Sequence, residues 1–228
     1  MTGTLYGLGV GPGDPELLTL KAVRLIEACP VLAYPAPLEG EGMARKIASA
    51  HISLRKTEIP LRMAMGKNRA SAIAAYAKGA ERIAAHLDAG HDVGVLCEGD
   101  PLLFGSFIYL MEILEDRYPI AIVPGISSVM AGAAALKTPL TKGDESLAVL
   151  PASRPQEDIA RALRSADTVV LLKAGKHLSK IAMVLERLGL ADKARYVEHV
   201  GWESQQVRPF AEAAAEGGPY FSLVVVRP

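Results

Sequence analysis

Short hydrophobic runs alternate with segments of helical periodicity along the first 136 residues. The runs predict strands at residues 4–10, 31–34, 57–61, 93–97 and 120–123. Among the predicted helices, residues 68–89 are the clearest, because apolar side chains recur there three and four positions apart, and Gly90 follows as a left-handed cap. This alternation with short connections is typical of a mostly parallel sheet that helices cover on both faces.

The second part of the chain has a different pattern. Strands are predicted at residues 147–150, 168–173, 195–200, 206–209 and 221–226. Two helices are predicted between them, at residues 156–164 and 178–188, and little helix separates the last three strands. Strands without a crossover helix tend to pair antiparallel, so we expect a mixed sheet. The chain is therefore predicted to form two α/β lobes, residues 1–124 and 125–228.

Composition and charge exclude several classes of protein. Of 228 residues half are hydrophobic, enough to bury a core, and this excludes disorder of the whole chain. The 25 basic residues equal the 25 acidic ones and aromatic residues are 5%, which argues against a nucleic-acid partner. No apolar run approaches the roughly 18 residues of a membrane span, and the N-terminus lacks a signal-peptide pattern. We expect a cytoplasmic protein with no membrane partner.

The cysteines and histidines indicate no metal centre. Cys29 and Cys97 are far apart in the sequence and belong to no CxxC or CxxH motif, so a disulfide framework or a zinc site is not expected. The five histidines show no ligand spacing either. A reducing cytosol and the absence of a protein-bound metal are therefore predicted.

Three loops rich in Gly, Pro and Asp follow predicted strands, at residues 9–15, 97–101 and 123–128. In a parallel sheet, ligands bind beyond the carboxyl ends of the strands. Each loop alone could be an ordinary turn with a helix cap, but three at one sheet edge favour a ligand site. The first loop is not a dinucleotide fingerprint, because Pro12 stands where the third glycine is required, and no P-loop Gly-Lys-Ser/Thr is present.

The three loops resemble signature motifs of the tetrapyrrole methylases. The segment GVGPGDPELLT at residues 9–19, Gly99-Asp100-Pro101 with Gly105, and PGISS at residues 124–128 match them in order over essentially the whole chain. The resemblance implies a class III methyltransferase with a mostly parallel N-terminal sheet, a mixed C-terminal sheet and a cofactor cleft between the lobes. It also implies S-adenosylmethionine as methyl donor, S-adenosylhomocysteine as product, and a homodimer.

Within this family, residues 97–106, Tyr34-Pro35 and residues 219–223 resemble the branch that methylates C20 of precorrin-2, giving precorrin-3A in cobalamin biosynthesis. The enzyme that makes precorrin-2 normally carries Gly-Gly-Asp-Pro at the second loop, where this chain has Glu98. The same methylation of a cobalt-containing precorrin-2 stays open, because the motifs barely separate the two. RNA or protein methylation on the same fold is a more distant alternative.

The resemblance assigns cofactor contacts to ten positions. They are Pro12, Gly13, Glu98, Gly99, Asp100, Leu103, Ser127, Ser128, Lys173 and Gly201. Lys173 departs from the family, because relatives often place a methionine there. Glu98 is also the candidate base for the proton that leaves the acceptor carbon after methylation.

Precorrin-2 is a flat oligocarboxylate, so its pocket is expected to be basic. Residues 45–69 hold seven basic side chains against one acid, Glu58, and arginine binds carboxylates with two parallel hydrogen bonds. The alternative is a basic face turned to solvent. The candidate substrate-binding residues are Asp14, Arg45, Arg62, Lys67 and Arg69.

Overall fold

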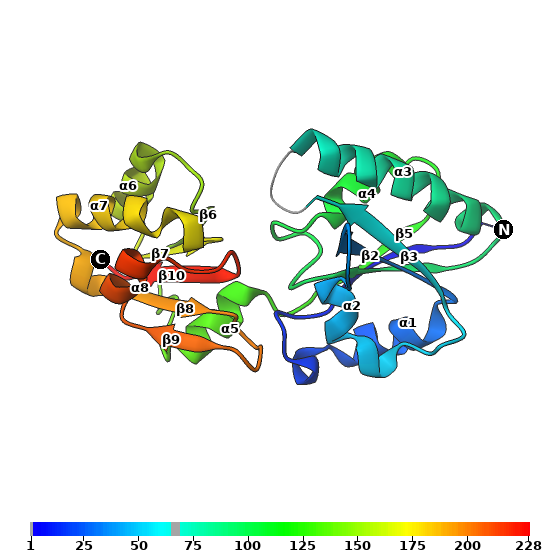
Figure 1. The fold of residues 1–228 in the computed structure, drawn as a ribbon, viewed down its shortest axis with the longest axis horizontal. Helices are drawn as coiled ribbons and strands as arrows, with labels where there is room; N and C mark the ends of the chain where they lie inside the picture. Colours follow the sequence, from blue (N-terminus) through cyan, green and yellow to red (C-terminus); the bar gives the residue numbers. More distant parts are fainter. Residues whose placement is uncertain (1, 65–68) are drawn as a thin grey trace. The chain divides into compact units, whose positions relative to one another are not determined.

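A computed structural model describes residues 2–64 and 69–228 of the chain. It divides into two compact units, Met1–Ser127 and Ser128–Pro228, each with its own sheet (Figure 1).

The described part of the first unit contains a five-stranded parallel sheet, as predicted. Its strands and helices are β1 (Leu5–Gly9), α1 (Leu20–Ala28), β2 (Val31–Pro37), α2 (Met43–Ile47), β3 (Thr57–Met63), α3 (Arg69–Asp88), β4 (Val93–Cys97), α4 (Phe107–Leu114) and β5 (Ile120–Val123), with 3-10 turns at Pro15–Leu17 and Ser49–His51. The strand order is β3-β2-β4-β1-β5, and every ladder is parallel. Strands β4, β1 and β5 are thus neighbours, which brings their carboxyl ends together.

Helices cover both faces of this sheet (Figure 1). Helices α3 and α4 pack on one face, and α1 and α2 pack on the other. Among the described side chains of α3, Ile73 is 45% exposed, whereas Tyr76, Ala80 and Ile83 are buried in the core. Gly90 ends this segment at φ +81°, and the next N–H, of His91, donates to the His86 carbonyl, so the predicted cap is confirmed.

The second unit contains a mixed five-stranded sheet, also as predicted. Its strands and helices are α5 (Ser128–Ala135), β6 (Leu147–Pro151), α6 (Gln156–Ser165), β7 (Thr168–Leu172), α7 (Leu178–Leu188), β8 (Ala194–Glu198), β9 (Gln206–Arg208), α8 (Phe210–Glu216) and β10 (Ser222–Val226), with 3-10 turns at Gly175–His177 and Ala191–Lys193. The order is β6-β7-β10-β8-β9. Strand β10 is antiparallel to its two neighbours, β7 and β8, and β8 is antiparallel to β9. Strand β6 is parallel to β7.

Helix α8 corrects the expectation of little helix between the last strands. The signals are present: Pro209 precedes the helix, alanines fill it, and Gly217 follows at φ +86°. Its seven residues are too few for a clear helical period. Helix α8 joins α6 and α7 on one face of the sheet, and α5 packs on the other.

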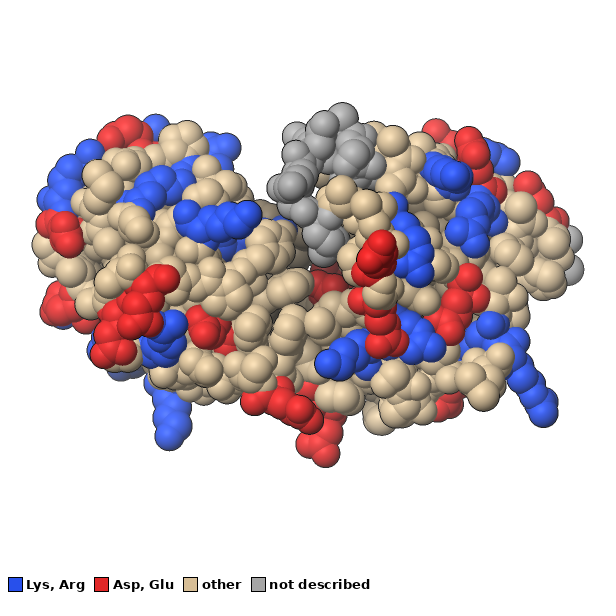
Figure 2. All heavy atoms as spheres, in the orientation of Figure 1, with Lys and Arg blue, Asp and Glu red and all other residues tan. Residues whose placement is uncertain are grey.

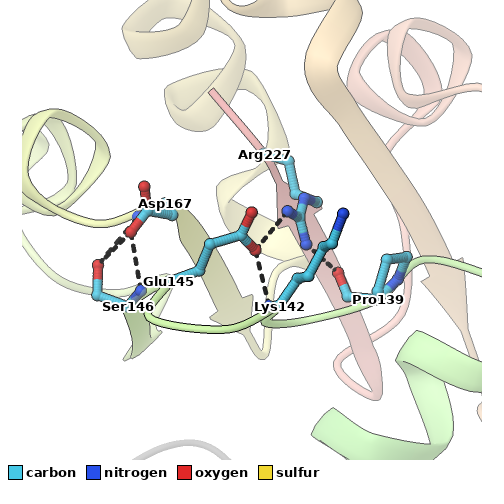
Figure 3. A network of polar contacts seen from close by, with 6 residues as sticks. All are labelled: Pro139, Lys142, Glu145, Ser146, Asp167 and Arg227. Atoms are coloured by element: carbon cyan, nitrogen blue, oxygen red, sulfur yellow. Dashed lines mark hydrogen bonds and ion pairs between the residues drawn. The ribbon is translucent and has the colours of Figure 1, made fainter.

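The long connection between α5 and β6 is fastened by a polar network (Figure 3). The Arg227 guanidinium, just after β10, donates to the Pro139 carbonyl and to the Glu145 carboxylate, both at 2.6 Å. Before β7, Asp167 accepts hydrogen bonds of 2.8 Å from the N–H and the hydroxyl of Ser146, which hold the pKa of its carboxyl below the ordinary value. The connection is therefore anchored to two strands of the sheet.

Candidate functional site

The three loops singled out in the sequence follow β1, β4 and β5, the adjacent strands of the first sheet. The first two are joined by a short antiparallel bridge between Gly11 and Gly99. The Gly99 N–H donates to the Gly11 carbonyl at 2.8 Å, and the Gly11 N–H returns a bond of 3.3 Å. Both residues have positive φ, +79° and +67°, a conformation that glycine adopts without steric cost.

Asp100 joins the second loop to the third. One carboxylate oxygen accepts the N–H of Leu102 at 2.9 Å, and the other accepts the N–H of Gly125 at 3.1 Å. The backbones also touch directly, because a Cβ built on Gly125 would lie 2.1 Å from the Gly99 carbonyl oxygen. The expectation that the three loops meet at one sheet edge is thus confirmed within the first unit.

The other predicted residues of this edge lie on the same loops. Asp14 caps the turn Pro15–Leu17 by accepting the Glu16 N–H at 2.8 Å, while Pro12 and Gly13 are partly buried. Leu103 is 40% exposed, next to Phe104, which is 42% exposed at φ +54°. The edge therefore combines closely packed backbone with apolar side chains open to a ligand.

Glu98 lies partly buried beside a buried tyrosine. Tyr76 of α3 is 3% exposed, and burial raises the pKa of its phenol to about 12. The side chain of Ser106 acts to lower this pKa, and the negative charge of Glu98 acts to raise it. Burial likewise raises the pKa of the Cys97 thiol above its ordinary range, as expected for a packing residue. Ser127, which ends the first unit, is 9% exposed.

Lys173 and Gly201 lie at one edge of the second sheet. Lys173 follows β7 at φ +59°, with its ammonium 5.6 Å from the centre of the Tyr220 ring. Gly201 follows β8 at φ +80° and donates its N–H to the Gln205 side chain at 2.8 Å. Because β10 is antiparallel to β7 and β8, its first two residues meet the ends of these strands: Ser222 pairs with Glu198 of β8 and Leu223 with Leu172 of β7.

Aromatic side chains that the sequence analysis did not assign to the site line this edge. The His199 and Trp202 rings stack at 4.7 Å and 5°, and the Phe221 ring lies 5.1 Å from that of Trp202. Tyr220 meets Phe221 edge to face. Their positions in the sequence could have predicted this, because His199 directly follows strand β8 and the Tyr220–Phe221 pair directly precedes strand β10.

The predicted basic cradle is only partly described. Arg45 binds two carboxylates of its own chain, those of Glu41 and Glu58. Arg62 donates to the carbonyls of Pro37, Leu38 and Gly40, at 2.9–3.3 Å. Lys67 lies outside the described residues, and Arg69 begins α3 with its side chain outside the description. The cradle stays a prediction, and Arg45 and Arg62 would have to give up these partners to join it.

The ion pair between Arg45 and Glu58 predicts a pH dependence of stability. The Arg45 guanidinium, assisted by the Tyr34 hydroxyl at 2.6 Å, holds the pKa of the Glu58 carboxyl below its ordinary value of 4.5. A lowered folded pKa gives a stabilisation that is present above the unfolded pKa and is lost as the pH falls through the folded pKa. Glu58→Gln should lower the free energy of unfolding at neutral pH by about 1–3 kcal/mol and flatten its decline in acid.

Urea unfolding from neutral to acidic pH measures this effect. The control is Glu41→Gln, which removes the more exposed carboxylate that Arg45 binds and should have a smaller effect. Equal acid slopes in the wild type and Glu58→Gln would contradict the assignment.

No single-sign patch dominates the surface in view, because basic and acidic side chains are interspersed over each unit (Figure 2). Among residues 2–64 and 69–228, no three His, Cys, Asp or Glu side chains are grouped as a metal would need. Both cysteines are buried free thiols. No helix of the described segments combines the length and the apolar character that crossing a bilayer requires.

Comparison with known proteins gives consistent matches. The model of the Tetrapyrrole (Corrin/Porphyrin) Methylases matches residues 4–215. Cobalamin biosynthesis protein CobIJ of Mycobacterium tuberculosis is 40% identical over 98% of this chain but 46% of its own length, so this chain spans about half of that relative. Precorrin-2 C(20)-methyltransferase of a Sinorhizobium species is 37% identical over 98% of this chain and 95% of its own.

Two further matches bear on the acceptor and on the cofactor. Cobalt-precorrin-2 C(20)-methyltransferase of Salmonella typhimurium is 31% identical over 99% of this chain and 97% of its own. The structure of uroporphyrin-III C-methyl transferase from Thermus thermophilus, complexed with S-adenyl homocysteine, has a TM-score of 0.71 at 26% identity, over 98% of this chain and 97% of that one.

Proposed function

Because this chain belongs to the tetrapyrrole (corrin/porphyrin) methylases, we propose that it is an S-adenosylmethionine-dependent methyltransferase that methylates C20 of precorrin-2, giving precorrin-3A in cobalamin biosynthesis. The observation that carries this proposal is the similarity to a protein named precorrin-2 C(20)-methyltransferase over nearly the full length of both chains. The match to a methyltransferase structure complexed with the demethylated cofactor supports the choice of donor.

The loops of the first unit fit such a cofactor. The Gly11–Gly99 bridge and the Asp100 bonds fix the backbone at the sheet edge, and Leu103 offers an exposed apolar side chain for the methionine part. Both Asp100 carboxylate oxygens accept N–H groups of the chain itself, so we propose that Asp100 contributes chiefly by shaping the loops. The contacts assigned to Pro12, Gly13, Ser127, Ser128, Lys173 and Gly201 stay predictions.

When bound, the cofactor supplies a methyl group that the positive charge of its sulfonium has already activated. The chain therefore needs to bind the donor, direct its methyl group at the acceptor carbon and exclude water. Orientation alone can remove roughly 7–11 kcal/mol from a barrier. Fixed loops serve this task, and the close backbone packing of Gly99 and Gly125 holds the second and third loops in place.

Glu98 is the proposed base for the proton that leaves the methylated carbon. Glu98→Gln should lower kcat by about 100-fold or more and remove the acidic limb of the pH–rate profile, an effect beyond any loss of S-adenosylhomocysteine affinity that its predicted cofactor contact would cause. Steady-state kinetics over a pH series with calorimetry on the same samples checks this. An unchanged pH–rate profile would remove Glu98 from the role.

The proposed function is tested by supplying methyl-labelled S-adenosylmethionine with metal-free precorrin-2 and, in parallel, with its cobalt complex. NMR of the product should place the label on C20 of the metal-free acceptor, and a reaction without acceptor serves as control. Transfer to neither acceptor, or transfer to another carbon, contradicts the proposal.

The cobalt complex is the second candidate acceptor. Similarity to a protein named cobalt-precorrin-2 C(20)-methyltransferase favours it, although the identity, 31%, is below the 37% of the metal-free counterpart. A kcat/KM at least tenfold higher for the cobalt complex would replace the first candidate by the second.

We also propose that the protein is a homodimer in the cytoplasm. The positive mean hydropathy of +0.21 is compatible with a buried subunit interface. The two free thiols are compatible with a reducing compartment. Sedimentation equilibrium should give twice the chain mass of 24.2 kDa, and a monomer at micromolar concentration would contradict the dimer.

A further inference from the structure

A tyrosine and a glutamate are buried together in the second sheet. Tyr196 and Glu198 are two positions apart on β8 and therefore point to the same face. Tyr196 is 0% exposed and Glu198 7% exposed. The Tyr196 hydroxyl donates to the Glu198 carboxylate at 2.6 Å, and burial followed by this bond raises the pKa of the phenol above its ordinary range. The hydroxyl therefore remains a donor at physiological pH.

A contribution to stability does not by itself explain why this pair is buried. A buried carboxylate is costly unless other groups compensate its charge. The ion pair recorded for Glu198 is with Arg208, at 3.9 Å, and Arg208 also binds the exposed Glu216. Because apolar side chains of similar volume could fill such a site without that cost, the geometry imposed by the pair is the better explanation.

The pair holds the turn that precedes β10. Ser222 lies opposite Glu198 in the ladder, and its hydroxyl donates to the Pro219 carbonyl at 2.7 Å. Gly218 packs directly on the phenol, since a Cβ there would lie 2.1 Å from the Tyr196 hydroxyl oxygen. The Tyr196 hydroxyl therefore packs against Gly218, and the Ser222 hydroxyl holds Pro219, the next residue of the same turn.

The turn that follows β8 begins directly after this pair and is tied to the turn before β10. Glu198 is the last residue of β8, and His199, directly after it, takes a φ of +51° that is unusual outside glycine. The His199 N–H donates to the Phe221 carbonyl at 2.8 Å, which ties this turn to the one before β10. The two turns carry Trp202 and Phe221 of the aromatic cluster and Gly201 of the predicted cofactor contacts.

We propose that Tyr196 and Glu198 are positioning residues that hold the turns at residues 199–202 and 219–221 in the conformation in which the second unit meets the cofactor. The inference rests on the proposed function and adds to it a buried support beneath predicted contact residues. Neither side chain touches the cofactor in this arrangement, because both are buried beneath the turns. Their effect is expected on binding and on the local fold of the turns.

The test compares Tyr196→Phe with Tyr118→Phe. The control also deletes a tyrosine–carboxylate hydrogen bond, from Tyr118 to Asp88 at 2.8 Å, but in the first unit. Trp202 is the sole tryptophan, so its fluorescence without ligand reports on the turn after β8. We expect Tyr196→Phe to change this emission and to weaken S-adenosylhomocysteine binding about tenfold by calorimetry, as loss of one well-placed hydrogen bond would. Tyr118→Phe should leave emission and affinity within twofold of the wild type.

A second pair of variants separates positioning from loss of fold. Glu198→Gln keeps a side-chain oxygen that can accept from Tyr196, so affinity and emission should stay near the wild type. Glu198→Ala removes the acceptor and should behave like Tyr196→Phe. Wild-type emission and affinity in both Tyr196→Phe and Glu198→Ala would overturn the inference. If the wild type itself gives no binding heat, the proposed function fails, and the emission of Tyr196→Phe then decides the inference alone.

Discussion

Replacing Gly125 by alanine is expected to abolish S-adenosylhomocysteine binding and to lower the free energy of unfolding by about 3 kcal/mol or more. A Cβ at this position would lie 2.1 Å from the Gly99 carbonyl oxygen and 2.8 Å from the Gly9 Cα. These are backbone atoms of two other loops, and no rotamer change can relieve the contact. The first and second loops would have to move apart from the third.

Calorimetry with S-adenosylhomocysteine and urea unfolding measure the two effects. Gly143→Ala is the control, because nothing lies within 4 Å of the added Cβ, although its φ of +60° should cost roughly 1–2 kcal/mol. The control should therefore lose some stability and keep its affinity. Wild-type affinity in Gly125→Ala would show that the close packing of the loops is dispensable.

Asp100→Ala is expected to be the next most damaging change. It removes the acceptor of two backbone N–H groups, those of Leu102 and Gly125, and so disconnects the second loop from the third. The Gly125 N–H is partly buried and costs about 1–3 kcal/mol when it loses its acceptor, whereas water can replace the acceptor of the exposed Leu102 N–H. We therefore expect a loss of about 1–3 kcal/mol in stability with at least a tenfold loss of affinity. Asp100→Asn should retain part of both, because its amide oxygen can still accept one bond.

Asp92→Ala is a matched control at the amino-terminal ends of the same strands, opposite the three loops. Asp92 precedes β4 and accepts the Thr4 N–H, just before β1, at 2.7 Å. Its removal should cost about 1 kcal/mol and leave S-adenosylhomocysteine affinity unchanged. Equal losses of affinity in the two alanine variants would mean that Asp100 acts through overall stability alone.

Local sequence patterns were sufficient to predict most of the architecture. The parallel sheet follows from strands that alternate with helices, and the antiparallel ladders of β10 follow from strands without long crossovers. Helix α8 was missed because seven residues barely complete two turns, so its apolar Phe210 and Ala213 form no recurring stripe.

The site was predictable in outline and not in its contacts. The rule that ligands bind at the carboxyl ends of strands placed three loops together, whereas the hydrogen bond from the Gly125 N–H to the Asp100 carboxylate joins residues 25 positions apart and follows from no local pattern. Counting charges gave a basic segment but could not show that Arg62 is bound to backbone carbonyls. Glu41 lies four residues before Arg45, and this spacing could have predicted their ion pair from the sequence.

Strand β10 lies in the middle of the second sheet although it is the last strand of that sheet to be synthesised. Strands β7 and β8 each pair with it and not with each other, so two half-sheets remain unjoined on the ribosome until residues 222–226 emerge. In the first unit β4 joins β1 to β2, and the last strand, β5, only adds to β1 at the edge, so this sheet is joined before its last strand emerges. During translation the N-terminal unit can therefore reach its final structure while the nascent second unit still exposes unpaired strand edges, the state that chaperones protect.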